Sequence, residues 1–140
     1  MESKINSCIF PESSVLPELF LLETIVETTV PILFLCHDKK WQLYIVSRCY
    51  ANAEKIIWFV QQTNKRDIIN LLTNTITIRE IFTTQNTINV ISHKANNECL
   101  TQKVPLIQLE STLLPTPGQF LDAENEEFSE LVSVLKNMSN

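Results

Sequence analysis

Residues 31–63 read PILFLCHDKKWQLYIVSRCYANAEKIIWFVQQT, and the expected architecture follows from these residues. It holds three apolar segments, 31–37, 41–50 and 55–61, separated by polar turns at 38–40 and 51–53. Short apolar runs that are rich in β-branched and aromatic residues and bounded by turn residues are typical of strands. Because both faces of these strands are apolar, we expect a three-stranded meander in the middle of a sheet that is covered on both sides.

The flanking segments extend this sheet and add two helices. Residues 19–27 predict either a further strand or a short helix, and residues 87–92 and 100–109 predict two more strands. Between them, Asn64 can cap one short helix, and Thr77 with Glu80 forms the capping box of a second. The expected fold class is therefore α+β: a mainly antiparallel sheet with a central meander, two short helices after the third or fourth strand, and a C-terminal amphipathic helix.

Composition shifts divide the chain into four parts. Residues 1–18 carry two prolines and little periodicity, which indicates a loosely packed N-terminal arm. Residues 19–112 form the α+β domain. Residues 113–118 hold two prolines and the only glycine, so they predict a linker. Residues 119–140 predict an acidic amphipathic helix that starts near Asp122.

This C-terminal helix is the candidate binding element. Its apolar side chains recur at helical spacing on one face, and its acidic side chains lie on the other. The helix either folds back on its own sheet, which needs a cover, or docks in the groove of a partner. The candidate partner-binding residues are Glu124, Glu126, Glu127, Phe128, Glu130, Leu131 and Leu135.

The overall composition excludes several classes of protein. With one glycine in 140 residues, the chain cannot build a glycine-rich phosphate loop or a dinucleotide-binding fingerprint. The longest apolar segment, 19–36, is interrupted by Glu23 and Glu27, and the first residues lack the layout of a signal peptide. We therefore expect a cytoplasmic protein that does not bind a membrane.

The net charge of −5 is unevenly distributed. Residues 31–109 carry a charge of +4, whereas residues 1–30 carry −4 and residues 110–140 carry −5. The basic body contains the aromatic residues Trp41, Tyr44, Tyr50 and Trp58, and bases interleaved with aromatics are how proteins hold single strands. Nucleic-acid binding by residues 31–109 is thus the alternative hypothesis, although the isoelectric point near 5.0 disfavours it.

The sequence shows no spacing pattern that is typical of a catalytic site or a metal site. Cys36, His37 and Asp38 are adjacent, but successive side chains of a strand point to opposite faces, so Cys36 and His37 should diverge. The other metal-ligand types lack the short paired spacing of a zinc site. The acidic run at 124–130 is typical of a solvated face. We expect no enzyme, no metal and no cofactor.

Two motifs carry a family resemblance. Residues 31–35, PILFL, precede a charged turn and the segment YIV at 44–46, and residues 71–82 read LLTNTITIREIF. Together they resemble a family of small uncharacterised bacterial α+β domains with a P-L-L-F strand, a hairpin and an L-L-x-G-x-I-T-L-R-E-A helix pair. The resemblance covers about residues 19–109 and implies no activity. Where that family favours glycine this chain has Asn74, which tolerates the left-handed conformation.

These observations predict a non-catalytic protein-binding module. The expected partner is another protein with a basic surface, or a further copy of the chain in a homo-oligomer. By analogy with small acidic proteins, we expect an accessory subunit, or an antitoxin-like or inhibitor-like partner of a toxin or defence protein, in a bacterial or phage system. On this hypothesis, removal of residues 119–140 abolishes binding and leaves the fold intact.

Overall fold

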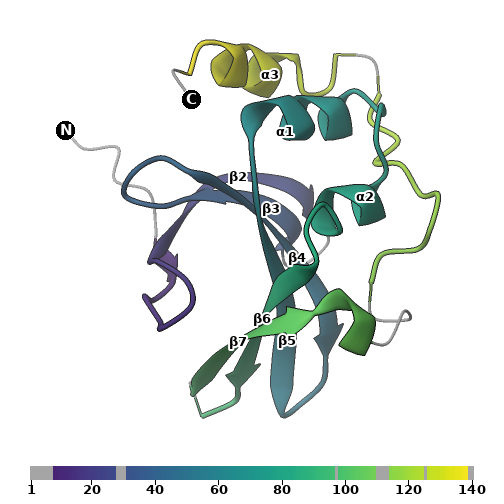
Figure 1. The fold of residues 1–140 in the computed structure, drawn as a ribbon. Coiled ribbons are helices and arrows are strands. Elements are labelled where there is room, and N and C mark those ends of the chain that lie inside the picture. The colour runs from purple at the N-terminus through teal and green to yellow at the C-terminus, as the bar shows by residue number, and fades with distance from the viewer. Residues whose placement is uncertain (1–7, 28–30, 97, 110–113, 125, 139–140) are drawn as a thin grey trace.

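The computed structural model describes residues 8–27, 31–96, 98–109, 114–124 and 126–138. Within these ranges the chain forms one seven-stranded sheet with short helices packed on it (Figure 1). The strands are β1 (Cys8–Phe10), β2 (Leu19–Glu27), β3 (Pro31–His37), β4 (Leu43–Ala51), β5 (Lys55–Thr63), β6 (Thr87–Lys94) and β7 (Cys99–Pro105). The helices are α1 (Lys65–Leu72), α2 (Ile78–Phe82), the 3-10 helix η1 (Leu106–Gln108) and α3 (Ser129–Lys136).

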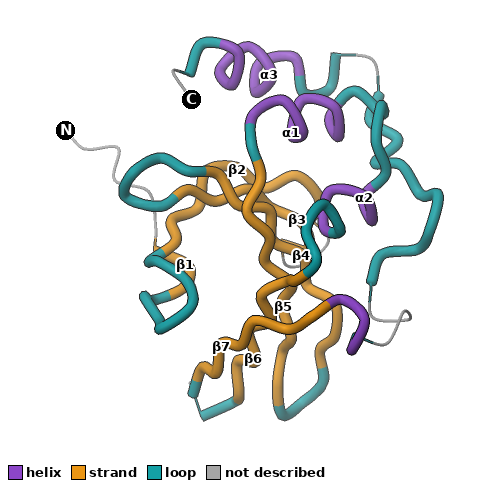
Figure 2. Tube along the Cα trace, in the orientation of Figure 1, coloured by secondary structure: helices purple, strands orange, loops and turns teal. Residues whose placement is uncertain are grey.

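Every strand pairs antiparallel with the next strand along the chain, so the sheet order is β1 to β7. The predicted meander of β3, β4 and β5 is confirmed, and the ambiguous segment 19–27 is strand β2. The helix pair follows the fifth strand, not the third or fourth, because β1 precedes the strands that the sequence predicts. The molecule is largely sheet (Figure 2), so α+β describes it only in a coarse sense.

The sheet separates two apolar cores, as the apolar character of both strand faces predicts. Along β3, Leu33 and Leu35 point to one core while Phe34 and Cys36 point to the other. We call the first the helix-side core: Ile25, Leu33, Leu35, Leu43, Ile45, Phe59, Ile68, Leu71, Leu72, Ile81, Phe82, Ile88 and Leu135. We call the second the arm-side core: Phe10, Leu16, Leu19, Phe34, Cys36, Tyr44, Val46, Val60 and Ile91.

The N-terminal arm packs more closely than the sequence predicts. Phe10 and Leu16 are only 4% and 6% exposed. The ring of Phe10 on β1 meets the ring of Trp58 on β5 edge to face, with 5.7 Å between centroids. Four strand spacings in a flat sheet span about 19 Å, so this contact requires the sheet to curl around the arm-side core. The first seven residues of the predicted arm lie outside the described residues.

Both predicted helix caps are confirmed. The side chain of Asn64 accepts a hydrogen bond from the backbone nitrogen of Asp67 at 2.8 Å, which starts α1. Thr77 Oγ1 accepts from the nitrogen of Glu80 at 3.0 Å, and the Glu80 carboxylate accepts from the nitrogen of Thr77 at 2.7 Å. These caps end the loops that follow β5 and α1, and thereby place both helices over the helix-side core.

The C-terminal part differs from the predicted linker and long helix. Helix α3 begins at Ser129, because Asp122 and Glu126 adopt left-handed φ angles of 63° and 67° that a right-handed helix cannot contain. Arg79 Nη1 donates to the carbonyl of Pro115 at 3.0 Å, so the predicted linker is held against α2. Leu113, its first residue, lies outside the described residues.

Candidate functional site

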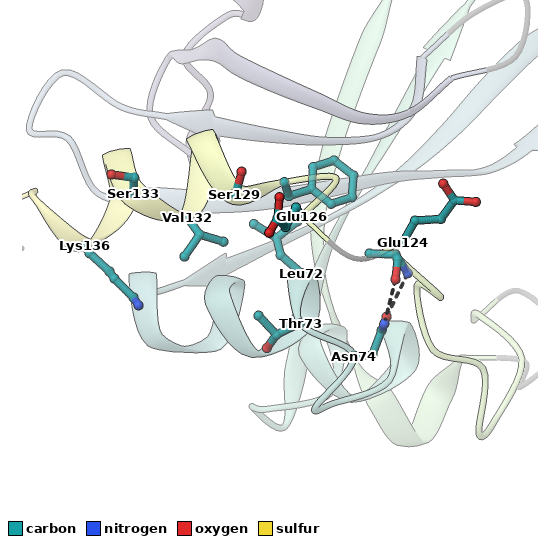
Figure 3. A pocket seen from close by; sticks show the side chains of 11 residues that line it. Leu72, Thr73, Asn74, Glu124, Glu126, Ser129, Val132, Ser133 and Lys136 are labelled. Atoms are coloured by element: carbon teal, nitrogen blue, oxygen red, sulfur yellow. Dashed lines mark hydrogen bonds between the residues drawn. The ribbon is translucent and has the colours of Figure 1, made fainter.

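A cavity of about 540 Å³ lies between the end of α1 and the C-terminal segment (Figure 3). Its lining is mixed, and Figure 3 shows Glu124 toward one end and Lys136 toward the other. The apolar lining residues include Leu72, Phe128 and Val132. The polar lining residues are Thr73, Asn74, Glu124, Glu126, Ser129, Ser133 and Lys136.

The C-terminal segment is attached to both ends of α1. At the end of α1, Asn74 Nδ2 donates to the carbonyl of Ala123 at 3.0 Å, and the nitrogen of Ala123 donates to Asn74 Oδ1 at 2.9 Å (Figure 3). At the start of α1, Lys65 Nζ donates to the carbonyl of Met138 at 2.6 Å. We call the Asn74–Ala123 pair of hydrogen bonds the amide clamp.

The amide clamp was not predictable from sequence, because 49 residues separate its partners. Asn74 adopts the left-handed conformation with φ of 61°, as expected for an asparagine at a position where glycine is favoured. Glycine would satisfy this backbone equally well, but only a side chain such as that of asparagine can bond both the N–H and the C=O of a second segment. The departure from the glycine pattern therefore adds a tertiary contact.

The structure divides the predicted partner-binding residues into two groups. Leu135 is fully buried in the helix-side core, and Phe128 and Leu131 pack against the same core. The acidic residues are exposed: Glu124, Glu126, Glu127 and Glu130. Of the two alternatives for the C-terminal helix, the structure shows the one in which it folds back on its own domain, so its apolar stripe is not offered to a partner.

We call the four exposed carboxylates of this segment the acidic surface: Glu124, Glu126, Glu127 and Glu130. Two of them, Glu124 and Glu126, also line the cavity. Glu127 Oε1 accepts a hydrogen bond from the backbone nitrogen of Glu124 at 2.9 Å, which orders the turn before α3. The ion pairs found in the described part of the chain lie elsewhere: Lys39 with Glu18, Arg66 with Asp67, and Lys94 with Glu98. The four carboxylates of this surface are exposed, so a cation from outside can reach them.

Cys36, His37 and Asp38 make separate structural contacts. Cys36 is fully buried in the arm-side core, and burial raises the pKa of its thiol to about 12. His37 Nδ1 lies 2.8 Å from the carbonyl of Asp38, and a carbonyl only accepts, so this nitrogen carries a hydrogen. The Asp38 carboxylate accepts from the backbone nitrogens of Lys40 and Gln42, both at 2.9 Å, which shapes the turn.

Trp41 occupies an unusual position in that turn. Its φ of 62° is left-handed, and its ring stacks on His37 with 3.7 Å between centroids and an interplanar angle of 3°. The sequence predicts Trp41 inside a strand, whereas β4 begins at Leu43. A hairpin with this turn needs one left-handed residue, and a tryptophan there is strained but gains the stacking contact.

The remaining thiols also keep their protons near neutral pH. Burial raises the pKa of Cys49 to about 12 and, to a smaller extent, the pKa values of the exposed Cys8 and Cys99. Among the described residues no group of three or more His, Cys, Asp and Glu is placed to hold a metal ion. No helix in the described ranges has the length and apolar character to cross a membrane.

The aromatic residues of the basic body do not form one stacking surface. Tyr44 is buried in the arm-side core, and Trp58 packs against that core. Trp41 and Tyr50 are exposed, but Trp41 precedes β4 and Tyr50 lies near its end, so the strand between them, from Leu43 to Tyr50, alone spans about 23 Å. Consecutive bases of a single strand cannot stack on two rings at that separation.

Comparison with known proteins places the chain in a family. The sequence pattern of DUF6575, described as a family of unknown function, matches residues 7–138. No curated protein and no solved structure matches the chain. The match extends past the two motifs at 31–46 and 71–82 and covers the residues of β1 and α3. The expected membership of an uncharacterised domain family is confirmed: the chain belongs to DUF6575, a family of unknown function.

Proposed function

We propose that this protein is a non-catalytic protein-binding module whose acidic surface docks on a basic surface of another protein. One observation carries the proposal. The C-terminal segment uses its apolar side chains, Phe128, Leu131 and Leu135, to pack on its own domain and leaves its carboxylates exposed. The segment therefore presents negative charge on a fixed backbone, which is how a protein guides a basic partner into one orientation.

The cavity beside the acidic surface supports a lysine or arginine as the group that enters. The aliphatic stem of such a side chain would lie against Phe128 and Val132, while its cationic head would reach Glu124 and Glu126, all of which line the cavity. The aromatic ring of Phe128 adds an attractive face for the cation. The amide clamp holds Ala123, next to Glu124, in place, so less ordering is needed on binding.

The biological setting in this proposal is an accessory subunit, or an antitoxin-like inhibitor of a toxin, nuclease or defence protein, in a bacterial or phage system. Such targets often carry basic substrate-binding surfaces, and an acidic module would cover them. Steering between opposite charges raises association rates by about 10- to 1,000-fold at low salt. The proposal thus predicts fast, salt-sensitive association.

A charge-neutralising variant tests the proposal. Glu124, Glu126, Glu127 and Glu130 are changed to glutamine together, and the matched control changes four other exposed glutamates: Glu12, Glu23, Glu27 and Glu54. Partners retained from a host lysate are identified for both variants, and the association rate of the purified partner is measured at two salt concentrations. We expect the control to bind as the parent does and the test variant to associate at least about tenfold more slowly.

Two results would count against this function. A partner that binds the test variant as fast as it binds the control does not use the acidic surface. Short single-stranded nucleic acids that bind the parent protein with a steep salt dependence would instead favour the alternative, a nucleic-acid-binding domain that uses the basic body at 31–109.

A further inference from the structure

The two edges of the sheet differ in how they are protected. Strand β1 at one edge has three residues, and its register with β2 shifts between Cys8 and Phe10. Strand β7 (Cys99–Pro105) at the other edge pairs with β6 in an unbroken register from Thr87 to His93. Sheet edges are normally blunted by short strands, bulges, lysine or proline, because an open edge recruits further strands. By this criterion β1 is protected along its whole length, whereas β7 carries Lys103 and Pro105 toward its end, and within the described residues no further strand pairs with its outer edge.

The hydrogen-bonding pattern shows which backbone groups of β7 face away from β6. Lys94 N donates to the carbonyl of Glu98, and Leu106 N donates to the carbonyl of Asn86, both at 2.8 Å. These two hydrogen-bonded pairs lie just beyond the two ends of the β6–β7 pairing. In an antiparallel ladder every second pair of residues is hydrogen-bonded, so the bonded pairs in between can be counted from either end. The residues of β7 that bond to β6 are therefore Leu100, Gln102 and Val104. The residues that direct their N–H and C=O groups outward are Cys99, Thr101 and Lys103.

The side chains of β7 are complementary to those of a second β7. Leu100 is 56% exposed, and it lies on the same face of the sheet as Val104, which pairs with Ile88 of the helix-side core. A two-fold axis at Gln102 places Leu100 opposite Val104 of the second copy. The same axis places Lys103, the only charged residue of the strand, opposite Thr101 of the second copy, so the two lysines do not face each other. A two-fold axis at Thr101 would instead place the apolar Leu100 opposite the polar Gln102 of the second copy.

We propose that β7 pairs antiparallel with β7 of a second copy of this chain, which joins the two sheets into one continuous sheet. The outward N–H and C=O groups of Thr101 and Lys103 bond to those of the other copy, and the exposed side chain of Leu100 is covered by Val104. This interface goes beyond the proposed function and does not depend on it. It uses the sheet edge, whereas the acidic surface lies on the segment that precedes and begins α3.

Two variants and one matched control test the interface by analytical ultracentrifugation over a range of protein concentrations. Thr101→Pro removes an outward N–H, and proline is tolerated on an edge strand where that group does not bond to the neighbouring strand. Leu100→Lys removes the apolar contact and adds charge. Val134→Lys is the control, because Val134 is similarly exposed at 50% but lies on α3. We expect a concentration-dependent dimer for the parent and the control, and at least about tenfold weaker dimerisation for both β7 variants.

Amide hydrogen exchange gives a second readout that does not depend on a variant. In the dimer, the amides of Thr101 and Lys103 should exchange more slowly as the protein concentration rises, whereas Gln102 should be protected at every concentration. A parent protein that stays monomeric at all concentrations would overturn the proposal, as would a dimer that both β7 variants still form. Protection of Thr101 and Lys103 by a different protein, with no self-association, would assign the edge to that protein and also refute the second copy.

Discussion

Leu135→Ala tests whether α3 is part of the core. Leu135 is fully buried in the helix-side core, and the substitution removes three carbon atoms from it. At about 0.8 kcal/mol for each buried carbon, the lost transfer free energy is about 2.4 kcal/mol. The cavity left behind adds to this value, so we expect the free energy of unfolding to fall by about 3–4 kcal/mol. A domain of ordinary stability, about 5–15 kcal/mol, would stay folded and allow the measurement.

The assay is urea denaturation followed by circular dichroism, with Val134→Ala as the matched control on the same helix. Val134 is 50% exposed, so its truncation should change the free energy of unfolding by less than about 0.5 kcal/mol. Equally small effects of both variants would show that α3 is not packed on its domain. Because α3 contributes to the core, we also expect removal of residues 119–140 to destabilise the domain, contrary to the expectation from sequence.

Three further predictions concern the turns and the thiols. Asn74→Gly should lower the free energy of unfolding by about 1 kcal/mol, because the amide clamp is lost. Asn74→Ala should lower it by about 2 kcal/mol, because alanine is also strained at the φ of 61°. Equal free energies of unfolding for the two variants in urea denaturation would contradict this prediction. Trp41→Gly should be more stable than Trp41→Ala by about 1 kcal/mol, since glycine relieves the left-handed backbone, and the reverse order would show no strain at Trp41. Cys36 and Cys49 titrate near 9.0 when unfolded but have a pKa of about 12 when folded. Their contribution to stability is therefore complete below about pH 9 and is lost as the pH rises toward 12. A thiol reagent at pH 8 should label Cys36, which is fully buried, only as fast as the protein unfolds, and rapid labelling of Cys36 in the native state would contradict its burial.

Local patterns predicted most of the fold. The apolar runs of β3, β4 and β5 and the caps at Asn64 and Thr77 depend on residues close in sequence, and all of them are confirmed. Strand β1 has only three residues, too few to show a period, and is stabilised by the distant contact of Phe10 with Trp58. Tertiary contacts, and not local propensity, decide such a strand.

The same distinction applies to the candidate site. The exposure of the carboxylates at 124–130 was predictable, because charge is rarely buried without a partner. The late start of α3 was not, because helical spacing of apolar residues continues through Phe128 although the backbone before it is left-handed at Glu126. The amide clamp of Asn74 depends on which segment passes beside it, and no local pattern contains that information.

The order of strands in the sheet has a consequence for how the chain folds. Since every strand pairs with its neighbour in sequence, the sheet can grow one strand at a time, and the longest connection within it, from Thr63 to Thr87, carries α1 and α2. The contacts that attach the C-terminal segment, Asn74 with Ala123 and Lys65 with Met138, close loops of 49 and 73 residues. We therefore expect the sheet to form before the C-terminal segment docks. During synthesis, a nearly complete sheet would exist before the acidic surface is assembled.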